Sequence, residues 1–150
     1  AITAYRQYIE AMGESAEAAD YYQLGKYYYT AASKDSTISK NYLSKADSLF
    51  AIVKERVPDS HLGSLWQART QALSDPETEQ GLAKPYYESC IPILEKNKDK
   101  YRNELIECYR YLGYYHYLKQ DMENSKNYWN KIITIDPSNT TAQEALKNIK

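Results

Sequence analysis

The chain has 150 residues, enough to bury a core, and its 19 basic and 20 acidic residues give a formal net charge of −1. That balance gives no electrostatic reason to expect nucleic acid or an anionic membrane as a partner, and the sequence contains neither a membrane-spanning apolar stretch nor a signal-peptide pattern. Val, Ile and Thr are sparse and no run alternates between apolar and polar residues, which argues against strands and favours helices.

Residues 1–17 are predicted to form one helix with a small–large–small spacing. The spacing residues are Ala4, Tyr8 and Ala11. The same spacing marks the second helix of the helix pairs that follow, so the chain is expected to start inside such a pair, as a piece of a longer array. Because no helix precedes this one, we expect an uncovered apolar face that includes Ile2, Tyr5 or Ile9 and through which two copies associate.

Residues 18–60 carry the pattern of a helix pair. A ring, two residues, Leu-Gly, two residues and a second ring are followed by a small residue, a large aromatic residue and a proline. These residues are Tyr21, Leu24, Gly25, Tyr28, Ala46, Phe50 and Pro58. More residues separate Gly25 from Ala46 than separate the matching pair in the last copy. We predict that the insertion lengthens the loop between the two helices, around residues 33–39, where a longer loop costs little entropy.

Residues 61–97 hold a degenerate copy of the same pattern, with a first helix predicted over residues 61–74. Ala68 stands in the glycine place, whereas Ser64, Gln67 and Gln71 replace the signature ring, leucine and tyrosine. Ala83, Tyr87 and Cys90 restore the pattern in the second helix. An alternative stays open, in which the first helix is rotated. Its buried stripe then comprises Leu62, Leu65, Trp66 and Leu73.

The second helix of this copy is predicted over residues 82–97 and contains two prolines. Pro85 fits the first turn, where no amide is needed for a helical hydrogen bond. Pro92 lies deeper and removes the amide that would bond the carbonyl of Glu88, so we predict a bend near Pro92.

Residues 98–139 carry a third copy after a short lead-in, and residues 140–150 follow as a predicted C-terminal capping helix. The third copy contains Tyr109, Leu112, Gly113, His116, Ser125, Trp129 and Pro137. Asn139 or Thr140 is the expected N-cap of the last helix. Its apolar stripe comprises Ala142, Ala145, Leu146 and Ile149.

The repeated frame resembles the tetratricopeptide repeat (TPR), a helix-turn-helix unit of about 34 residues. The resemblance covers nearly the whole chain. It implies an all-α fold, a right-handed superhelix of helix pairs (an α-solenoid) with residues 1–150 as one domain, and a usual role of holding another protein without catalysis or a cofactor. Gly25 and Gly113 are then places where two helices meet closely, and larger side chains there should destabilise the fold.

The chain has 17 tyrosines, which cluster chiefly in the first helices of the first and third copies, and in the family frame those of the first helices take two roles. Tyr21, Tyr28, Tyr109 and Tyr115 should pack between helices. The ligand-facing places fall on Tyr22, Lys26 and Tyr29, on Leu62, Leu65 and Arg69, and on Arg110, Tyr114 and Tyr117. From these we predict a peptide-binding set of Tyr22, Lys26, Tyr29, Arg69, Arg110, Tyr114 and Tyr117. Rings with positive charges suit an extended peptide that carries an acidic group and apolar or proline side chains.

Two features of the sequence bear on the class of partner and on the cellular location. Tyr22 and Lys26 stand where the carboxylate-clamp subfamily has lysine and asparagine, so we do not expect chaperone C-termini as partners. Tyrosine-rich repeats of this style are similar to those of long, often exported bacterial proteins, which favours an extracytoplasmic location. Two other functions stay open, a small-molecule or glycan-binding sensor and a structural repeat that assembles with itself.

No residue set supports catalysis. Cys90 and Cys108 match no metal motif and are expected to be buried thiols, with a disulfide open only in an oxidising compartment. His61 is expected to open a first helix and His116 to be half-buried, and neither has a nucleophile near it in sequence. Phosphate-binding, zinc and calcium motifs are absent from the sequence. We therefore predict a noncatalytic protein-interaction module.

Overall fold

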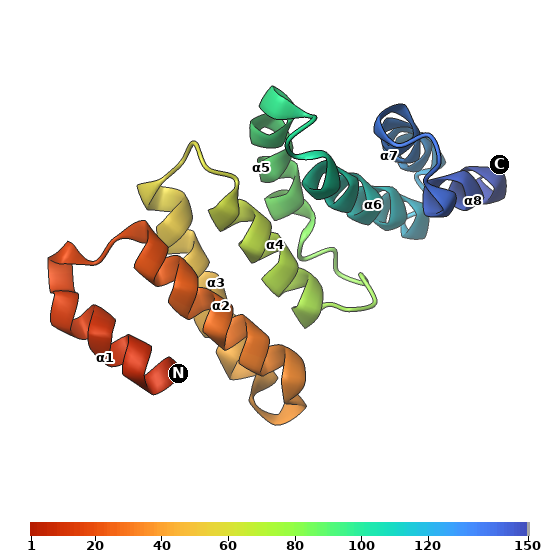
Figure 1. The fold of residues 1–150 in the computed structure, drawn as a ribbon. Helices are drawn as coiled ribbons and strands as arrows, with labels where there is room; N and C mark the ends of the chain where they lie inside the picture. The colour runs from red at the N-terminus through yellow and green to blue at the C-terminus, as the bar shows by residue number, and fades with distance from the viewer. Residues whose placement is uncertain (150) are drawn as a thin grey trace. The chain divides into compact units, whose positions relative to one another are not determined.

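The computed structural model describes residues 1–149, and within them the protein is helical without strands, as predicted. The helices of this part of the chain are α1 (Ile2–Met12), α2 (Ala18–Lys34), α3 (Ser36–Arg56), α4 (Leu62–Ser74), α5 (Lys84–Leu94), α6 (Arg102–Leu118), α7 (Met122–Ile135) and α8 (Thr140–Asn148) (Figure 1). Two 3-10 turns, Gly13–Ser15 and Glu95–Asn97, follow α1 and α5.

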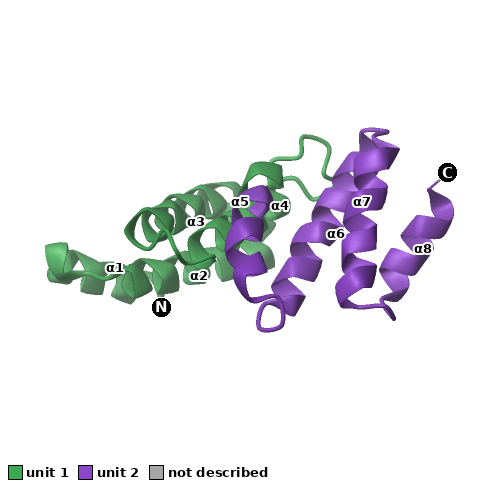
Figure 2. Cartoon of the chain, turned by 90° about the horizontal axis from the view of Figure 1, so that it is seen from above, with its two compact units in different colours: residues 1–86 green, residues 87–150 purple. Residues whose placement is uncertain are grey.

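The chain divides into two compact units, residues 1–86 and residues 87–150 (Figure 2). In the first unit α1 packs against α2, α2 against α3, and α3 against α4. In the second unit α6 packs against α7, and α7 against α8. Each unit therefore contains one helix pair that carries the full sequence frame, followed by a further helix.

The signature glycines lie where the paired helices approach each other. A Cβ atom at Gly25 would lie 2.6 Å from Cε1 of Phe50, and one at Gly113 would lie 2.8 Å from Cε2 of Trp129. Ser125 lies beside the second contact, and its hydroxyl donates a hydrogen bond of 2.7 Å to the carbonyl of Gly113. The predicted close approach at both glycines is confirmed, because no side chain larger than hydrogen fits there without movement.

The predicted long loop at residues 33–39 is wrong. Helix α2 ends at Lys34 and α3 begins at Ser36, so that only Asp35 separates them. The Asp35 carboxylate accepts hydrogen bonds from the Thr37 amide at 2.9 Å and from the Thr37 hydroxyl at 2.7 Å, which caps α3. The inserted residues thus lengthen the helices themselves, to 17 residues in α2 and 21 in α3.

The apolar face predicted to be uncovered on α1 is instead covered from within the chain. Ile2, Tyr5 and Ile9 are half-buried and pack against the core of α2 and α3. The Tyr5 hydroxyl also lies 3.4 Å from an oxygen of Asp20 at the start of α2. The large apolar side chains that α1 does expose are Tyr8 and Met12, at 44% and 36%.

Helix α4 buries most of the signature places of the frame, and of the stripe in the rotated alternative only Leu65 is buried, whereas Leu62 and Leu73 are half-buried. Ser64, Gln67 and Ala68, at the signature places, are buried, whereas Trp66 is only half-buried. Asp47 of α3 is a partner for two of the polar replacements, because its Oδ1 accepts hydrogen bonds from the Gln71 amide at 3.1 Å and from the Gln67 amide at 3.5 Å. Burial of amide side chains is tolerable where such a partner exists.

The segment from α4 to α5 is organised by one carboxylate. Asp75, the C-cap of α4, is 6% exposed and accepts hydrogen bonds from the amides of four successive residues. The donors are Glu79 at 3.0 Å, Gln80 at 3.1 Å, Gly81 at 2.8 Å and Leu82 at 3.3 Å. The buried carboxylate thereby fixes the backbone between the two helices.

The two prolines of α5 lie at different depths in the helix. Pro85 is the second residue of α5, as predicted, and Pro92 is inside it. Two residues after Pro92 the α-helical geometry ends, and the chain continues as the 3-10 turn Glu95–Asn97. The bend near Pro92 stays a prediction.

The last helix begins at the predicted cap. The side chain of Asn139 accepts a 3.0 Å hydrogen bond from the amide of Ala142. Ala142 is fully buried, and Ala145, Leu146 and Ile149 are half-buried or buried, so the predicted stripe is confirmed.

The signature ring Tyr109 predicts a pH dependence of stability. Its hydroxyl donates a 2.7 Å hydrogen bond to Oε1 of Glu95, and burial, followed by this carboxylate, raises the tyrosine pKa above its ordinary value. Because the pKa of Tyr109 is higher in the folded state than in the unfolded state, the protonated hydroxyl stabilises the fold. This stabilisation is complete below about pH 10 and is lost as the pH rises further. Urea unfolding from about pH 8 to about pH 11 should show a smaller alkaline loss in Tyr109→Phe than in the wild type. Equal slopes would contradict this assignment.

Candidate functional site

The predicted peptide-binding residues divide between the two units. Those of the first unit are Tyr22, Lys26 and Tyr29 on α2 and Arg69 on α4. Those of the second unit are Arg110, Tyr114 and Tyr117 on α6.

In the first unit the predicted tyrosines Tyr22 and Tyr29 lie beside Trp66 of α4, which is outside the predicted peptide-binding set. The ring centroid of Trp66 lies 5.9 Å from that of Tyr22, 5.4 Å from that of Tyr29 and 5.6 Å from that of Phe50. The Tyr29 ring stands at 90° to the indole, an edge-to-face arrangement, and the Phe50 ring is tilted by 34°. We call Tyr22, Tyr29, Phe50 and Trp66 the Trp66 cluster.

Two cations lie on the faces of these rings. The Lys26 ammonium is 4.3 Å from the centroid of Tyr22, and the Arg69 guanidinium is 4.9 Å from that of Trp66. At these distances the ring quadrupole attracts the charge and holds the side chain in place. The first unit therefore presents positive charges on an aromatic surface that has the Trp66 indole at its centre. Leu65, which the family frame placed among the ligand-facing residues, is buried and only 1% exposed.

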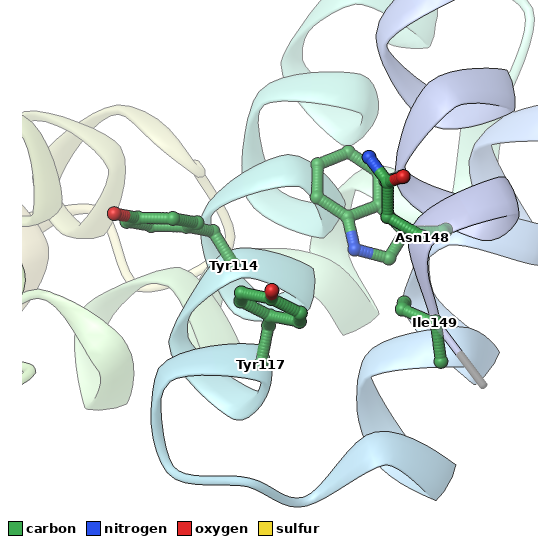
Figure 3. Close-up of a pocket in the computed structure, with 6 residues that line it drawn as sticks. Tyr114, Tyr117, Asn148 and Ile149 are labelled. Carbon is green, nitrogen blue, oxygen red and sulfur yellow. The ribbon is translucent and has the colours of Figure 1, made fainter.

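In the second unit the predicted tyrosines border an open pocket. Tyr114 and Tyr117 of α6 line a cavity of about 190 Å³ (Figure 3). The other lining residues are Trp129 of α7, Ala145 and Asn148 of α8, and Ile149. The two tyrosines are 44% and 42% exposed, whereas Trp129 is buried in the wall. The sequence frame assigned Trp129, Ala145 and Ile149 to packing, and no signal in the sequence marks Asn148.

Arg110 completes the α6 surface. It is exposed and precedes Tyr114 by four residues, which places the two side chains on the same face of the helix. The α6 surface, defined as Arg110, Tyr114 and Tyr117, thus combines a fixed positive charge with two exposed rings.

Tyr28 and Tyr109 have the packing role that the frame assigned to them. Each is 3% exposed. Tyr21 and Tyr115 are half-buried, and the Arg56 guanidinium lies 4.6 Å from the Tyr21 ring. The predicted division therefore holds for Tyr28 and Tyr109, which are buried, and for Tyr114 and Tyr117, which are exposed. Tyr22 and Tyr29, predicted to face a ligand, are half-buried like Tyr21 and Tyr115.

The remaining candidate chemistry has structural explanations. His116 is half-buried, with Nδ1 3.2 Å from an oxygen of Asp121 and its ring stacked on Tyr128 at 5.7 Å. Hydrogen bonds from Asn124, together with this histidine, lower the pKa of Asp121. Cys90 and Cys108 are completely buried. Among residues 1–149, no group of three or more His, Cys, Asp and Glu side chains is arranged to hold a metal ion, and no helix combines the length and apolar character needed to cross a membrane.

Comparison with known proteins agrees with this architecture. The chain is similar to the crystal structure of the C-terminal part of a TPR repeat-containing protein from Cytophaga hutchinsonii, with 37% sequence identity and a TM-score of 0.80. The match covers 93% of this chain and 52% of that one, so the chain spans about half the length of the matched structure. Neither the family models nor the curated proteins compared with the chain give a match. The sequence frame, the helix pairs that meet at Gly25 and Gly113, and this likeness together establish that the chain belongs to the tetratricopeptide repeat family.

Proposed function

We propose that this interaction module binds an extended segment of another protein through the first helices of its repeats. The observation that carries the proposal is the α6 surface, where Tyr114 and Tyr117 remain 44% and 42% exposed beside an apolar pocket. Tyrosine and arginine are enriched in the parts of interfaces that contribute most binding energy. The Trp66 cluster supplies a second aromatic surface, with Lys26 and Arg69 on its rings.

The chemistry of these surfaces favours a peptide that is both acidic and apolar. Arg110 offers a planar donor group that can bond a carboxylate bidentately, and the adjoining rings stack on proline or apolar side chains. The chain as a whole is almost neutral, so attraction for such a peptide must come from these local charges.

A small-molecule or glycan sensor is less well supported. Pockets for such ligands enclose most of the ligand and commonly have volumes of about 300 to 1,000 Å³. The pocket of the second unit has about 190 Å³, and the larger hollows of the first unit, of about 340 and 450 Å³, are wide open to solvent and would not enclose a ligand. Self-association through α1 would use the exposed Tyr8 and Met12, because Ile2, Tyr5 and Ile9 are packed within the chain.

Substitutions on α6 test the proposal. Peptides selected from a displayed random library on the immobilised chain provide the ligand. Arg110→Ala and Tyr114→Ala should each weaken peptide binding by about 1–2 kcal/mol, because an anchor is lost while the core stays closed. Isothermal titration gives the affinity, and thermal unfolding shows whether the fold is retained.

Tyr8→Ala is the matched control, since Tyr8 is as exposed as Tyr114, at 44%, but lies on α1. Its affinity should equal that of the wild type. If a folded Arg110→Ala, Tyr114→Ala double variant keeps wild-type affinity, the binding site does not include α6 and the proposal is wrong.

A further inference from the structure

The two units can be compared position by position. In each, a glycine of the first helix contacts the large aromatic residue of the second helix, Gly25 with Phe50 and Gly113 with Trp129. In each, a proline follows that aromatic residue by eight positions, and a further helix, α4 or α8, begins within four residues of the proline. The helices α2, α3 and α4 therefore correspond to α6, α7 and α8.

This correspondence places Ala145 where the first unit has Trp66. Each residue follows its proline, Pro137 or Pro58, by eight positions. Counting from the prolines also pairs Asn148 with Arg69, and counting from Gly113 and Gly25 pairs Tyr117 with Tyr29 and Tyr114 with Lys26. Five residues of the second-unit pocket thus correspond to residues in or beside the Trp66 cluster.

The difference between tryptophan and alanine explains why the second unit has a pocket at the place that the Trp66 indole occupies in the first unit. In the first unit the indole of Trp66 lies between Tyr22, Tyr29 and Phe50. In the second unit the methyl group of Ala145 leaves a cavity of about 190 Å³ against Trp129. An apolar cavity of roughly 150 Å³ is known to accept a benzene ring, so the space suits one aromatic side chain.

We infer that this pocket receives an aromatic side chain of the bound peptide, which takes the place that Trp66 occupies in the first unit. The inference rests on the proposed peptide-binding function and adds the identity of an anchor residue. By analogy with Tyr29 and Phe50, the incoming ring meets Tyr117 edge-to-face and Trp129 at a tilt. The pocket is lined mostly by apolar groups, and the Asn148 amide is a partner for the N–H of an indole or the hydroxyl of a phenol.

A small probe tests the pocket without a peptide. N-acetyl-tryptophanamide is titrated into the ¹⁵N-labelled chain, and the indole N–H signals of the two tryptophans are followed. The Trp129 signal should shift on binding and the Trp66 signal should not. If the Trp129 signal of the wild-type chain does not shift during the titration, the inference is wrong. A Trp129 shift that depends on protein concentration without probe would identify a second copy as the occupant and also overturn it.

Two variants exchange the alanine and the tryptophan at the corresponding places of the two units. Ala145→Trp should fill the pocket from within and weaken probe binding by about ten-fold or more, and Ala145→Leu is a smaller replacement should the tryptophan prevent folding. Trp66→Ala should open a second probe site, reported by the backbone amides of α2. Unchanged probe binding in folded Ala145→Trp or Ala145→Leu, or no second site in folded Trp66→Ala, would refute the equivalence of the units.

The peptide library separates this inference from the proposed function. Peptides enriched on the wild-type chain should share one aromatic residue, and its replacement by alanine should weaken binding about ten-fold to the wild type but little to Ala145→Trp. Enriched peptides without an aromatic residue would overturn the anchor and leave the proposed function standing. The absence of any enriched peptide would overturn the proposed function and the anchor with it.

Discussion

Replacing Asp75 by alanine is expected to lower the free energy of unfolding by about 3 kcal/mol, because four amide donors lose their acceptor together. The carboxylate is 6% exposed and accepts from Glu79, Gln80, Gly81 and Leu82 at 2.8–3.3 Å. Thr78 and Gly81 have φ angles of 57° and 67°, so the same bonds also hold backbone conformations that are unfavourable for most residues. Urea unfolding measures the loss.

Two further variants test whether the lost acceptor oxygens cause the loss of stability. Asp75→Asn keeps one acceptor oxygen, so its free energy of unfolding should lie between those of Asp75→Ala and the wild type. Glu77→Ala removes an exposed carboxylate from the same segment and should change stability by less than about 0.5 kcal/mol. A cost below about 1 kcal/mol for Asp75→Ala would show that water satisfies the four amides equally well.

Replacing Gly63 by alanine is expected to destabilise the protein by about 2 kcal/mol, although alanine ordinarily favours a helix over glycine. A Cβ atom there would lie 2.5 Å from the backbone nitrogen and 2.7 Å from the Cα of Lys54 in α3. Backbone atoms cannot rotate away, so α3 and α4 would have to separate. The measurement is again urea unfolding.

Gly113→Ala provides the comparison for Gly63→Ala. At Gly113 the obstructing atoms belong to the indole of Trp129, a side chain that can shift. Its cost should therefore be smaller than that of Gly63→Ala. The reverse order would mean that the core around Trp129 yields less than the backbone of α3.

The sequence frame predicted those features that depend on short-range spacing. The bounds of α4, the cap at Asn139 and the contacts at Gly25 and Gly113 follow from residue types at fixed separations. The segment around Asp35 was predicted wrongly for a local reason. Serine, threonine and aspartate occur in loops, yet the same residues cap a helix and fill its first turn, and composition alone does not distinguish the two.

The candidate site shows where sequence reasoning ends. The exposure of Tyr114 and Tyr117 follows from the frame, but the pocket beside them depends on the small size of Ala145, which is distant in sequence and resembles any alanine of an apolar stripe. Trp66 appeared only in the buried stripe of the rotated alternative, because its partners Tyr22 and Tyr29 lie on a different helix and spacing within residues 61–74 does not reveal them. The covered face of α1 likewise depends on α2, which the pattern within residues 1–17 cannot show.

The positions of the two tryptophans allow the unfolding of each unit to be followed separately by fluorescence. The chain contains two, and Trp66 lies in the first unit and Trp129 in the second. Replacing either one by phenylalanine leaves a chain whose intrinsic fluorescence reports on a single unit, and Phe50 shows that phenylalanine fits the place of Trp129 in this frame. Repeat proteins gain their cooperativity from interfaces between neighbours. The two emission signals make it measurable whether residues 1–86 and 87–150 melt in one transition or in two.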